Sequence, residues 1–155
     1  MVLLCGMFRL GAFALIFDGD GAILLCHRRD IDAWNLPGGR VEQNESPWDA
    51  AIREVREEVG LLVEVDRLAG IYAKPQQQEI VFSFACSIVG GELTTSDEAD
   101  DIRYFPVADL PANTLHKHVA RIHDALASPH HPILQEQVGP STRQLIEEGC
   151  WPPRT

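Results

Sequence analysis

The chain has little positive charge and few cysteines. Its 155 residues include 13 lysines and arginines against 23 aspartates and glutamates, a formal net charge of −10. Such a field repels a phosphate backbone, so long nucleic acid is not an expected partner. The four cysteines (Cys5, Cys26, Cys86 and Cys150) form no Cys-x-x-Cys pair, and three of them lie in apolar runs, where a reduced thiol packs as a small hydrophobe. We therefore expect no disulfide framework and a reducing, cytoplasmic location.

The sequence also lacks a long uninterrupted hydrophobic run. Its most apolar stretch, Met1 to Phe17, is broken by Arg9 and leads into the turn sequence Asp18-Gly19-Asp20-Gly21. No basic region precedes this stretch, so we predict a buried strand here rather than a signal or an anchor. A membrane partner is not expected.

The length and the 45% share of hydrophobic residues are typical of one globular domain, which we predict over residues 1–155. A chain of this size buries about two-thirds of its unfolded surface, so one apolar core needs no metal or disulfide to hold it. The sequence leaves the oligomeric state, including a homodimer, open.

Hydrophobic periodicity and turn residues predict alternating strands and helices. The expected strands are 11–17, 22–28, 61–72, 80–89 and 102–106, and the expected helices are 47–59, 115–127 and a short one between Ser141 and Gly149. The first two strands are expected to pair antiparallel across the Asp-Gly turn, and Trp34 to Gly39 is expected to form a tight loop. This mixture predicts an α/β (α+β) fold with a mixed sheet packed between helices.

The predicted helix 47–59 carries the chemistry. Glu54, Glu57 and Glu58 stand at i, i+3 and i+4, so their carboxylates project from one stripe, expected to face outward beside Gly38-Gly39. The residues expected to anchor the helix from its opposite face are Trp48, Ile52, Val55 and Val59. Like charges this close repel one another, and Mg²⁺, which prefers oxygen ligands and keeps positions open for substrate, would relieve that repulsion. The alternative is a solvated helix face with Arg53–Glu57 ion pairs.

The wider spacing favours the metal site. Gly39, Glu45, Arg53 and the three helical glutamates, with apolar Val55, Gly60 and apolar Leu61, stand in the order Gly-x5-Glu-x7-Arg-Glu-apolar-x-Glu-Glu-x-Gly-apolar. This segment is similar to the Nudix box, with every defined position filled. The preceding hairpin, the Trp34-x-Leu36-Pro37-Gly38-Gly39 approach and the later strands also resemble the Nudix fold. The resemblance therefore covers roughly residues 8–127 and leaves 128–155 as a C-terminal extension of unclear role.

The resemblance implies an α/β/α sandwich that hydrolyses a nucleoside diphosphate linked to a variable moiety. It implies that Glu54, Glu57 and Glu58 bind Mg²⁺, or Mn²⁺ as a substitute, with the Gly38 carbonyl as a further ligand. It also implies that Glu45 and Arg53 support these ligands, with the Arg53 cation orienting a ligating carboxylate.

Hydrolysis also needs a carboxylate that takes a proton from water. In the Nudix family this base is either a box glutamate, here including Glu57, or an acid on a later loop, where Glu98 is the candidate. Its rivals are Asp97, Asp100 and Asp101, with Glu79 and Glu92 as weaker ones, and the plain alternative is a solvated acidic turn.

Several other residues are candidates for contact with the small nucleotide substrate. Arg28 and Arg29 end a strand near the glycines, where a guanidinium matches phosphate oxygens. Trp34 is a candidate for stacking on a base, and Gly39 for close backbone approach, although such a tryptophan more often packs a loop. The histidines at 116, 118, 123, 130 and 131 lack the cysteine or carboxylate partners of a structural metal site and are better explained as a polar helix face.

The leading interpretation is a Mg²⁺-dependent pyrophosphohydrolase of small nucleotides. ADP-ribose-like sugar nucleotides and nucleoside triphosphates both remain open, because Pro75 lies near, but not at, the place that the family associates with ADP-ribose. A non-catalytic nucleotide-sensing module of the same fold is the competing class, and a related diphosphate isomerase is a third. The retained carboxylates favour catalysis.

Overall fold

The computed structural model describes residues 6–152, which form eight strands and three helices, with four strands before the first helix and three more before the second. The strands are β1 (Arg9–Leu15), β2 (Ile23–Arg28), β3 (Trp34–Asn35), β4 (Gly38–Arg40), β5 (Leu61–Lys74), β6 (Glu79–Gly91), β7 (Ala99–Phe105) and β8 (Ile133–Glu136). The helices are α1 (Pro47–Val59), α2 (His116–Ala127) and α3 (Thr142–Glu147), with 3₁₀ turns at Pro75–Gln77 and Val107–Asp109.

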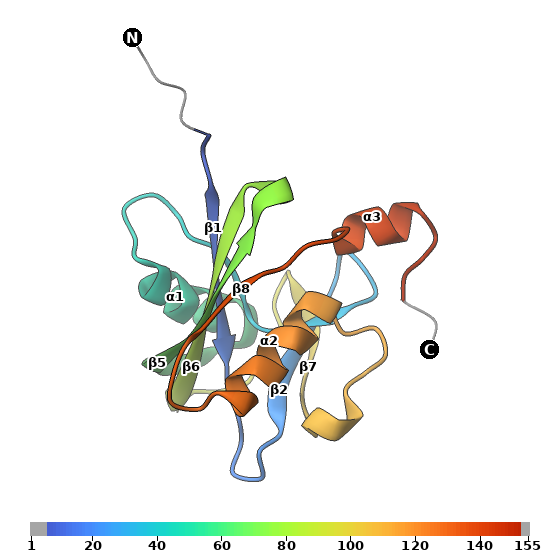
Figure 1. The fold of residues 1–155 in the computed structure, drawn as a ribbon. Coiled ribbons are helices and arrows are strands. Elements are labelled where there is room, and N and C mark those ends of the chain that lie inside the picture. Colours follow the sequence, from blue (N-terminus) through green and yellow to red (C-terminus); the bar gives the residue numbers. More distant parts are fainter. Residues whose placement is uncertain (1–5, 153–155) are drawn as a thin grey trace.

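The strands form two sheets, in the orders β4-β1-β6-β5-β8 and β3-β2-β7. The larger sheet is mixed, because β1 pairs parallel with β6 and antiparallel with β4, and β8 pairs parallel with β5. Helices α1 and α2 cover opposite faces of the larger sheet (Figure 1). The predicted mixed α/β/α sandwich is therefore confirmed.

The alternation of side chains along the strands builds a separate core against each helix. Ala12 and Ala14 of β1 pack with Val55 of α1, whereas Leu15 of β1 packs with Ile122 of α2. Successive strand residues point to opposite faces, so one strand supplies both cores. This two-sided burial fixes α1, and with it the acidic residues it carries, against the middle of the larger sheet.

Helix α1 begins and ends where the sequence predicts. The Ser46 side chain accepts a hydrogen bond from the Asp49 N–H at 3.1 Å, and Pro47 occupies the first turn. Gly60 ends the helix with a φ of 79°, a left-handed conformation that favours glycine, and its N–H donates to the Arg56 carbonyl.

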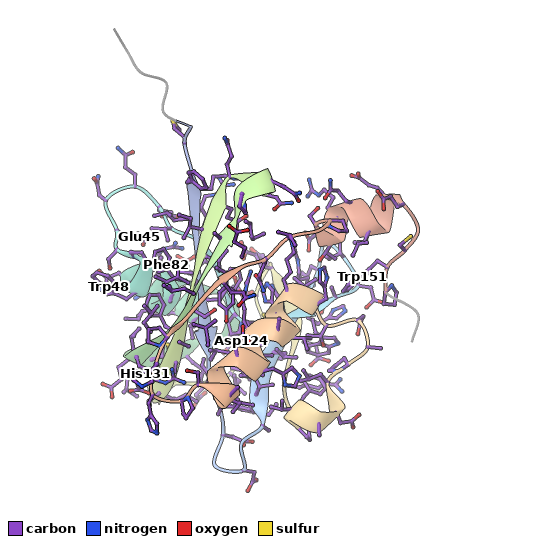
Figure 2. All side chains as sticks on the ribbon, viewed as in Figure 1. Glu45, Trp48, Phe82, Asp124, His131 and Trp151 are labelled. Carbon is purple, nitrogen blue, oxygen red and sulfur yellow. The ribbon has the colours of Figure 1, made fainter. Side chains whose placement is uncertain are left out.

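The predicted antiparallel pairing across the Asp-Gly turn holds only next to the turn, and the predicted anchoring of α1 by Trp48 is wrong. The strands around the Asp-Gly turn pair only beside it, through a bridge between Phe17 and Ile23, and then separate, because β1 joins β6 in one sheet while β2 joins β7 in the other. Trp48 does not anchor α1, since 55% of its surface is exposed and it lies at the outer edge of the molecule (Figure 2). Its position in the first turn carries it past the edge of the sheet.

The segment after α2 returns to the sheet. Residues Ile133–Glu136 pair in parallel with Gly70–Ala73 of β5, and a capping box of Ser141 and Gln144 begins α3 within the range predicted for the short helix. Within residues 6–152, no helix is long and apolar enough to cross a membrane.

Candidate active site

Three carboxylates from two distant segments meet beside α1. One ligand oxygen each from Glu54, Glu58 and Glu98 lies within 4.8 Å of the others. Glu54 and Glu58 are one helical turn apart on α1, and Glu98 comes from the loop that precedes β7. This is the only group of at least three such residues that the structure brings together within the part of the chain it describes.

Glu58 is the most deeply buried of the three. Only 7% of its surface is exposed, and within residues 6–152 it forms no ion pair. Burial, followed by the hydrogen bond and the charge of Glu54, raises the pKa of Glu58 well above its usual range. With no positive charge beside it among the described residues, Glu58 favours its protonated, neutral form until such a charge is supplied.

The glycines of β4 leave room for the α1 carboxylates. A Cβ atom on Gly39 would lie 2.7 Å from the carboxyl carbon of Glu54. Gly38 has a φ of 153°, and a Cβ there would lie 2.3 Å from the Ala12 carbonyl oxygen of the neighbouring strand. Gly39 therefore makes space for a functional side chain, and Gly38 for the sheet itself.

Arg53 holds this arrangement together. Its guanidinium donates to Glu45 at 2.7 and 3.0 Å, to Glu54 at 3.1 Å and to the Arg40 carbonyl at 3.0 Å. The ion pair with Arg53 lowers the pKa of Glu45 to about 2. The carboxylate of Glu54 is thus held from the side by the same guanidinium that binds Glu45.

The Glu98 loop is tied to the end of β2. The Arg29 N–H donates to the Glu98 carbonyl at 3.1 Å, and the Arg29 Nε donates to the Ser96 carbonyl at 2.8 Å. Ser96 Oγ also accepts from the N–H of Glu98 at 3.3 Å. These bonds use the guanidinium of Arg29 to fix the loop.

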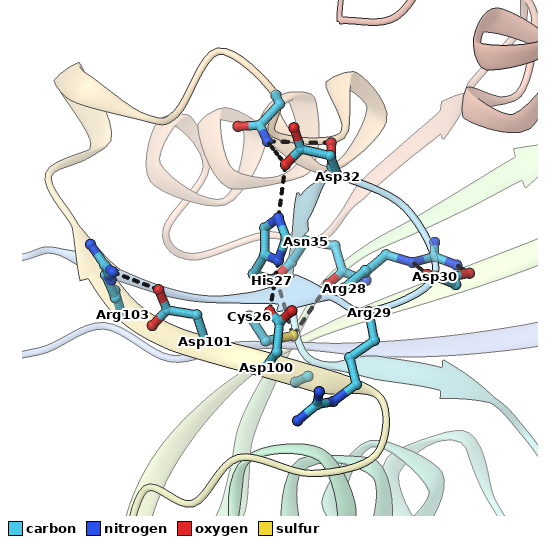
Figure 3. A network of polar contacts seen from close by, with 12 residues as sticks. Cys26, His27, Arg28, Arg29, Asp30, Asp32, Asn35, Asp100, Asp101 and Arg103 are labelled. Atoms are coloured by element: carbon cyan, nitrogen blue, oxygen red, sulfur yellow. Dashed lines mark hydrogen bonds and ion pairs between the residues drawn. The ribbon is translucent and has the colours of Figure 1, made fainter.

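Two of the rival acids, Asp100 and Asp101 of β7, are held elsewhere. Asp100 contacts His27 Nδ1 at 2.7 Å, while Asp32 contacts His27 Nε2 at 2.9 Å (Figure 3). Asp101 forms an ion pair with Arg103 at 2.6 Å. Of the acids proposed as the base on this loop, only Glu98 joins the carboxylate group.

A cavity of about 560 Å³ opens beside the carboxylates. Its walls include Arg28, Gly38, Glu58 and Glu98, and also Asp97. Arg28 is held by Asp30 through two bonds of 2.6 and 2.8 Å, which leaves its guanidinium at the cavity wall. The predicted phosphate-binding position of Arg28 is thus next to the carboxylate group.

Two predicted site residues are placed outside this group. Glu57 is 56% exposed in its side chain and pairs with Arg53 at 3.1 Å, because the i+3 position turns away from the row shared by Glu54 and Glu58. Trp34 packs edge-on against His27 and Phe105 and does not line the cavity. The expectation that all three helical carboxylates face outward together is therefore wrong, since Glu58 points inward and Glu57 outward.

Cys26 and Asn35 are neighbours of the site that sequence reasoning did not single out. The Cys26 thiol lies 3.6 Å from Glu58 Oε2 and 3.2 Å from Asn35 Oδ1. Burial raises the pKa of this thiol well above its usual value, so it stays protonated. Its position within an apolar run indicates only a core residue, so no pattern in the sequence identifies it.

The donor set fits a divalent cation of the Mg²⁺ class. Such cations take carboxylate and carbonyl oxygens, and the Glu58 carboxylate is buried with no positive partner among the described residues. Arg53 donates to only one carboxylate oxygen of Glu54. The oxygens of Glu54, Glu58 and Glu98 that lie within 4.8 Å of one another therefore share no cation of the protein. The site therefore lacks the positive charge that a bound cation would bring.

Comparison with known proteins assigns the chain to a family. A family model described as a NUDIX domain matches residues 7–126. The chain belongs to the Nudix family. The matched range agrees with the segment over which the sequence resembles that family.

Individual Nudix relatives support this assignment. Over 106 residues the chain is 35% identical to "Putative 8-oxo-dGTP diphosphatase" of Bacillus subtilis, which covers 68% of this chain and 71% of the relative. It is 35% identical over 103 residues to "ADP-ribose pyrophosphatase" of Methanocaldococcus jannaschii, covering 62% and 61%. A crystal structure of an ADP-ribose pyrophosphatase from Streptococcus suis superposes with a TM-score of 0.70 at 28% identity, covering 84% of this chain and all of that one. The chain is therefore a Nudix hydrolase, of a family that acts on phosphoanhydride bonds of nucleotides.

Proposed function

We propose that this Nudix hydrolase cleaves the diphosphate linkage of a small nucleotide with the help of Mg²⁺. The observation that carries the proposal is that Glu54, Glu58 and Glu98 converge, and that Glu58 is buried with no positive partner within residues 6–152. Relatives named for 8-oxo-dGTP and ADP-ribose support both nucleoside triphosphates and sugar nucleotides as the substrate class.

The residues of the site divide the work. Glu54 and Glu58 would hold the cation beside Glu98, and the Gly38 carbonyl and Glu57 are the further ligands that the Nudix pattern assigns. A bound Mg²⁺ supplies positive charge that offsets the negative charge of the diphosphate during hydrolysis. Arg28 lies at the wall of the same cavity, where it would bind a phosphate oxygen.

The proton of the attacking water needs an acceptor. Glu98 is exposed to the cavity and its loop is fixed by Arg29, so we assign it this role. Arg53 and Glu45 position Glu54, and the Gly39 backbone allows its close approach.

The first experiment is a panel of nucleotides incubated with Mg²⁺. Release of nucleoside monophosphate with pyrophosphate would indicate a triphosphate substrate, and release of two monophosphates would indicate a sugar nucleotide. Retained Mg²⁺ binding with no hydrolysis of any nucleotide would overturn the proposal in favour of a nucleotide-sensing module.

The second experiment tests the assigned carboxylates. Glu58→Gln and Glu57→Gln are each expected to abolish turnover, at least 10²-fold, while circular dichroism reports an intact fold. Glu64→Gln changes an exposed acid of β5 outside the site and serves as the matched control. Full activity of both site variants would refute the roles given to them.

A further inference from the structure

The C-terminal segment closes a second cavity next to the carboxylate cavity. This cavity has a volume of about 520 Å³ and shares Phe13, Arg28 and Asp30 with the first. Its remaining walls include Lys74 of β5, His118 of α2 and Arg143 of α3. One extended ligand can therefore reach from the carboxylates into this second cavity.

Part of this wall lies outside the family match. The NUDIX domain match ends at residue 126, yet residues 141–143, 146 and 147 line the cavity. The extension, whose role the sequence leaves open, thus shapes a ligand-sized space that the shared domain does not supply by itself.

His118 presents a fixed donor to this cavity. Its ring is buried, with 6% of the residue exposed, and the Leu36 N–H donates to its Nδ1 at 3.1 Å. Because Nδ1 accepts, the proton of the neutral ring resides on Nε2. Burial lowers the pKa of His118 well below its usual value, so the ring remains a neutral donor, and its Nε2–H makes no hydrogen bond within residues 6–152.

Positive charge gathers behind and around His118. Arg121 is 2% exposed, lies over the rings of Phe13 and Tyr72, and has an Nη1 atom with no hydrogen-bond partner among residues 6–152. Lys74 has one acidic partner, Glu79 at 3.2 Å, and Arg143 forms no ion pair in the described part of the chain. Two acids, Asp30 and Glu147, also line the cavity, against three cations, Arg28, Lys74 and Arg143. In a chain of net charge −10, this positive excess favours an anionic ligand here.

We propose that the second cavity binds a further phosphoryl group carried by the nucleotide outside its diphosphate, with His118 and Arg143 as donors to its oxygens. A neutral base would leave the Arg143 guanidinium at the cavity wall without an ionic partner, whereas a phosphoryl group accepts from a ring N–H and a guanidinium at once. The inference rests on the proposed nucleotide substrate but needs no hydrolysis.

The test is therefore a binding experiment without divalent metal. Titration calorimetry in EDTA compares adenosine 2′,5′-bisphosphate and adenosine 3′,5′-bisphosphate with AMP, so that only the additional phosphoryl group differs. At least one bisphosphate is expected to bind on the order of tenfold more tightly than AMP, which is the scale of a hydrogen bond to a charged group.

Matched variants locate the effect. Arg143 and Arg56 are both exposed helical arginines, so Arg143→Gln is expected to bring the affinity ratio close to one while Arg56→Gln preserves it. In ¹⁵N spectra the Nε2–H signal of His118 is expected to shift with the favoured bisphosphate and not with AMP. Equal affinities for all three ligands, or a preference that Arg143→Gln leaves unchanged, would overturn the proposal, whatever the outcome of the hydrolysis panel.

Discussion

At the scale of single residues, the site depends on what two adjacent glycines leave empty. The Glu54 carboxyl group occupies the space that a Cβ on Gly39 would take, and the backbone of β1 occupies the space that a Cβ on Gly38 would take. The two positions look alike in the sequence, but the first serves the site and the second serves the sheet.

Substituting each glycine by alanine separates these roles. Gly39→Ala is expected to displace the end of a flexible side chain, so Mg²⁺ affinity falls about 10- to 100-fold with little change in the free energy of unfolding. Gly38→Ala, with a Cβ 2.3 Å from a backbone oxygen, is expected to lower that free energy by about 2 kcal/mol or more. Calorimetric Mg²⁺ titration and urea denaturation measure both quantities, and unchanged Mg²⁺ affinity in Gly39→Ala would contradict the role given to that gap.

At the scale of elements, the helix that carries the acids is well predicted and its surroundings are less so. Ser46, Pro47 and Gly60 act within the helix itself, so local sequence fixes its two ends. The separation of β1 and β2 depends on which distant strand each one joins, and β8 is short and mostly exposed, so neither leaves a local pattern.

The same distinction applies to the site. The spacing of the box predicts that Glu54 and Glu58 share a row, but not which of them is buried, because that depends on Cys26 of β2, which contacts both Glu58 and Asn35 of β3. The inclusion of Glu98 is predicted from its acidic loop, whereas the bonds from Arg29 that hold it there appear only in three dimensions.

The loop before α1 has a pH-dependent tie to that helix. Arg53, followed by the Glu42 N–H, holds the pKa of Glu45 at about 2, below its ordinary value of 4.5. The stabilisation is therefore fully present above about pH 4.5 and is lost as the pH falls toward 2. Glu45→Gln is expected to lower the free energy of unfolding at pH 7 and to differ less from the natural protein at pH 3.5, as measured by urea denaturation. A difference that stays constant with pH, as expected for the exposed control Glu64→Gln, would show that the ion pair contributes no such stability.

At the scale of the whole molecule, the two cavities differ in their balance of charge, with more acids than cations lining the first and more cations than acids lining the second. Carboxylates from α1 and the Glu98 loop surround one, and His118, Lys74 and Arg143 border the other, with Phe13 and Arg28 between them. The acidic end suits a cation and the basic end suits an anion, so a nucleotide accompanied by Mg²⁺ matches the polarity along the whole cleft.

This polarity has a cost for the metal-free fold. Glu58 is buried beside Glu54, and its raised pKa means that the folded protein resists ionisation that the unfolded chain allows. Stability of the metal-free protein is therefore expected to decrease as the pH rises above about 4.5, the ordinary value of a glutamate. Glu58→Gln removes the ionisable group and keeps its shape, so it is expected to stabilise the metal-free protein at pH 7 by about 1–3 kcal/mol, or several degrees in Tm.

Mg²⁺ should reverse that order. A cation that binds only the folded state stabilises the natural protein by about 2.7 kcal/mol at 100 times its Kd, whereas the variant, lacking a buried ligand, gains far less. Thermal unfolding of both proteins in EDTA and in Mg²⁺ measures the four values. If the variant is less stable than the natural protein in EDTA, the Glu58 side chain stabilises the fold without a cation. A residue retained for binding a cation should instead destabilise the metal-free fold.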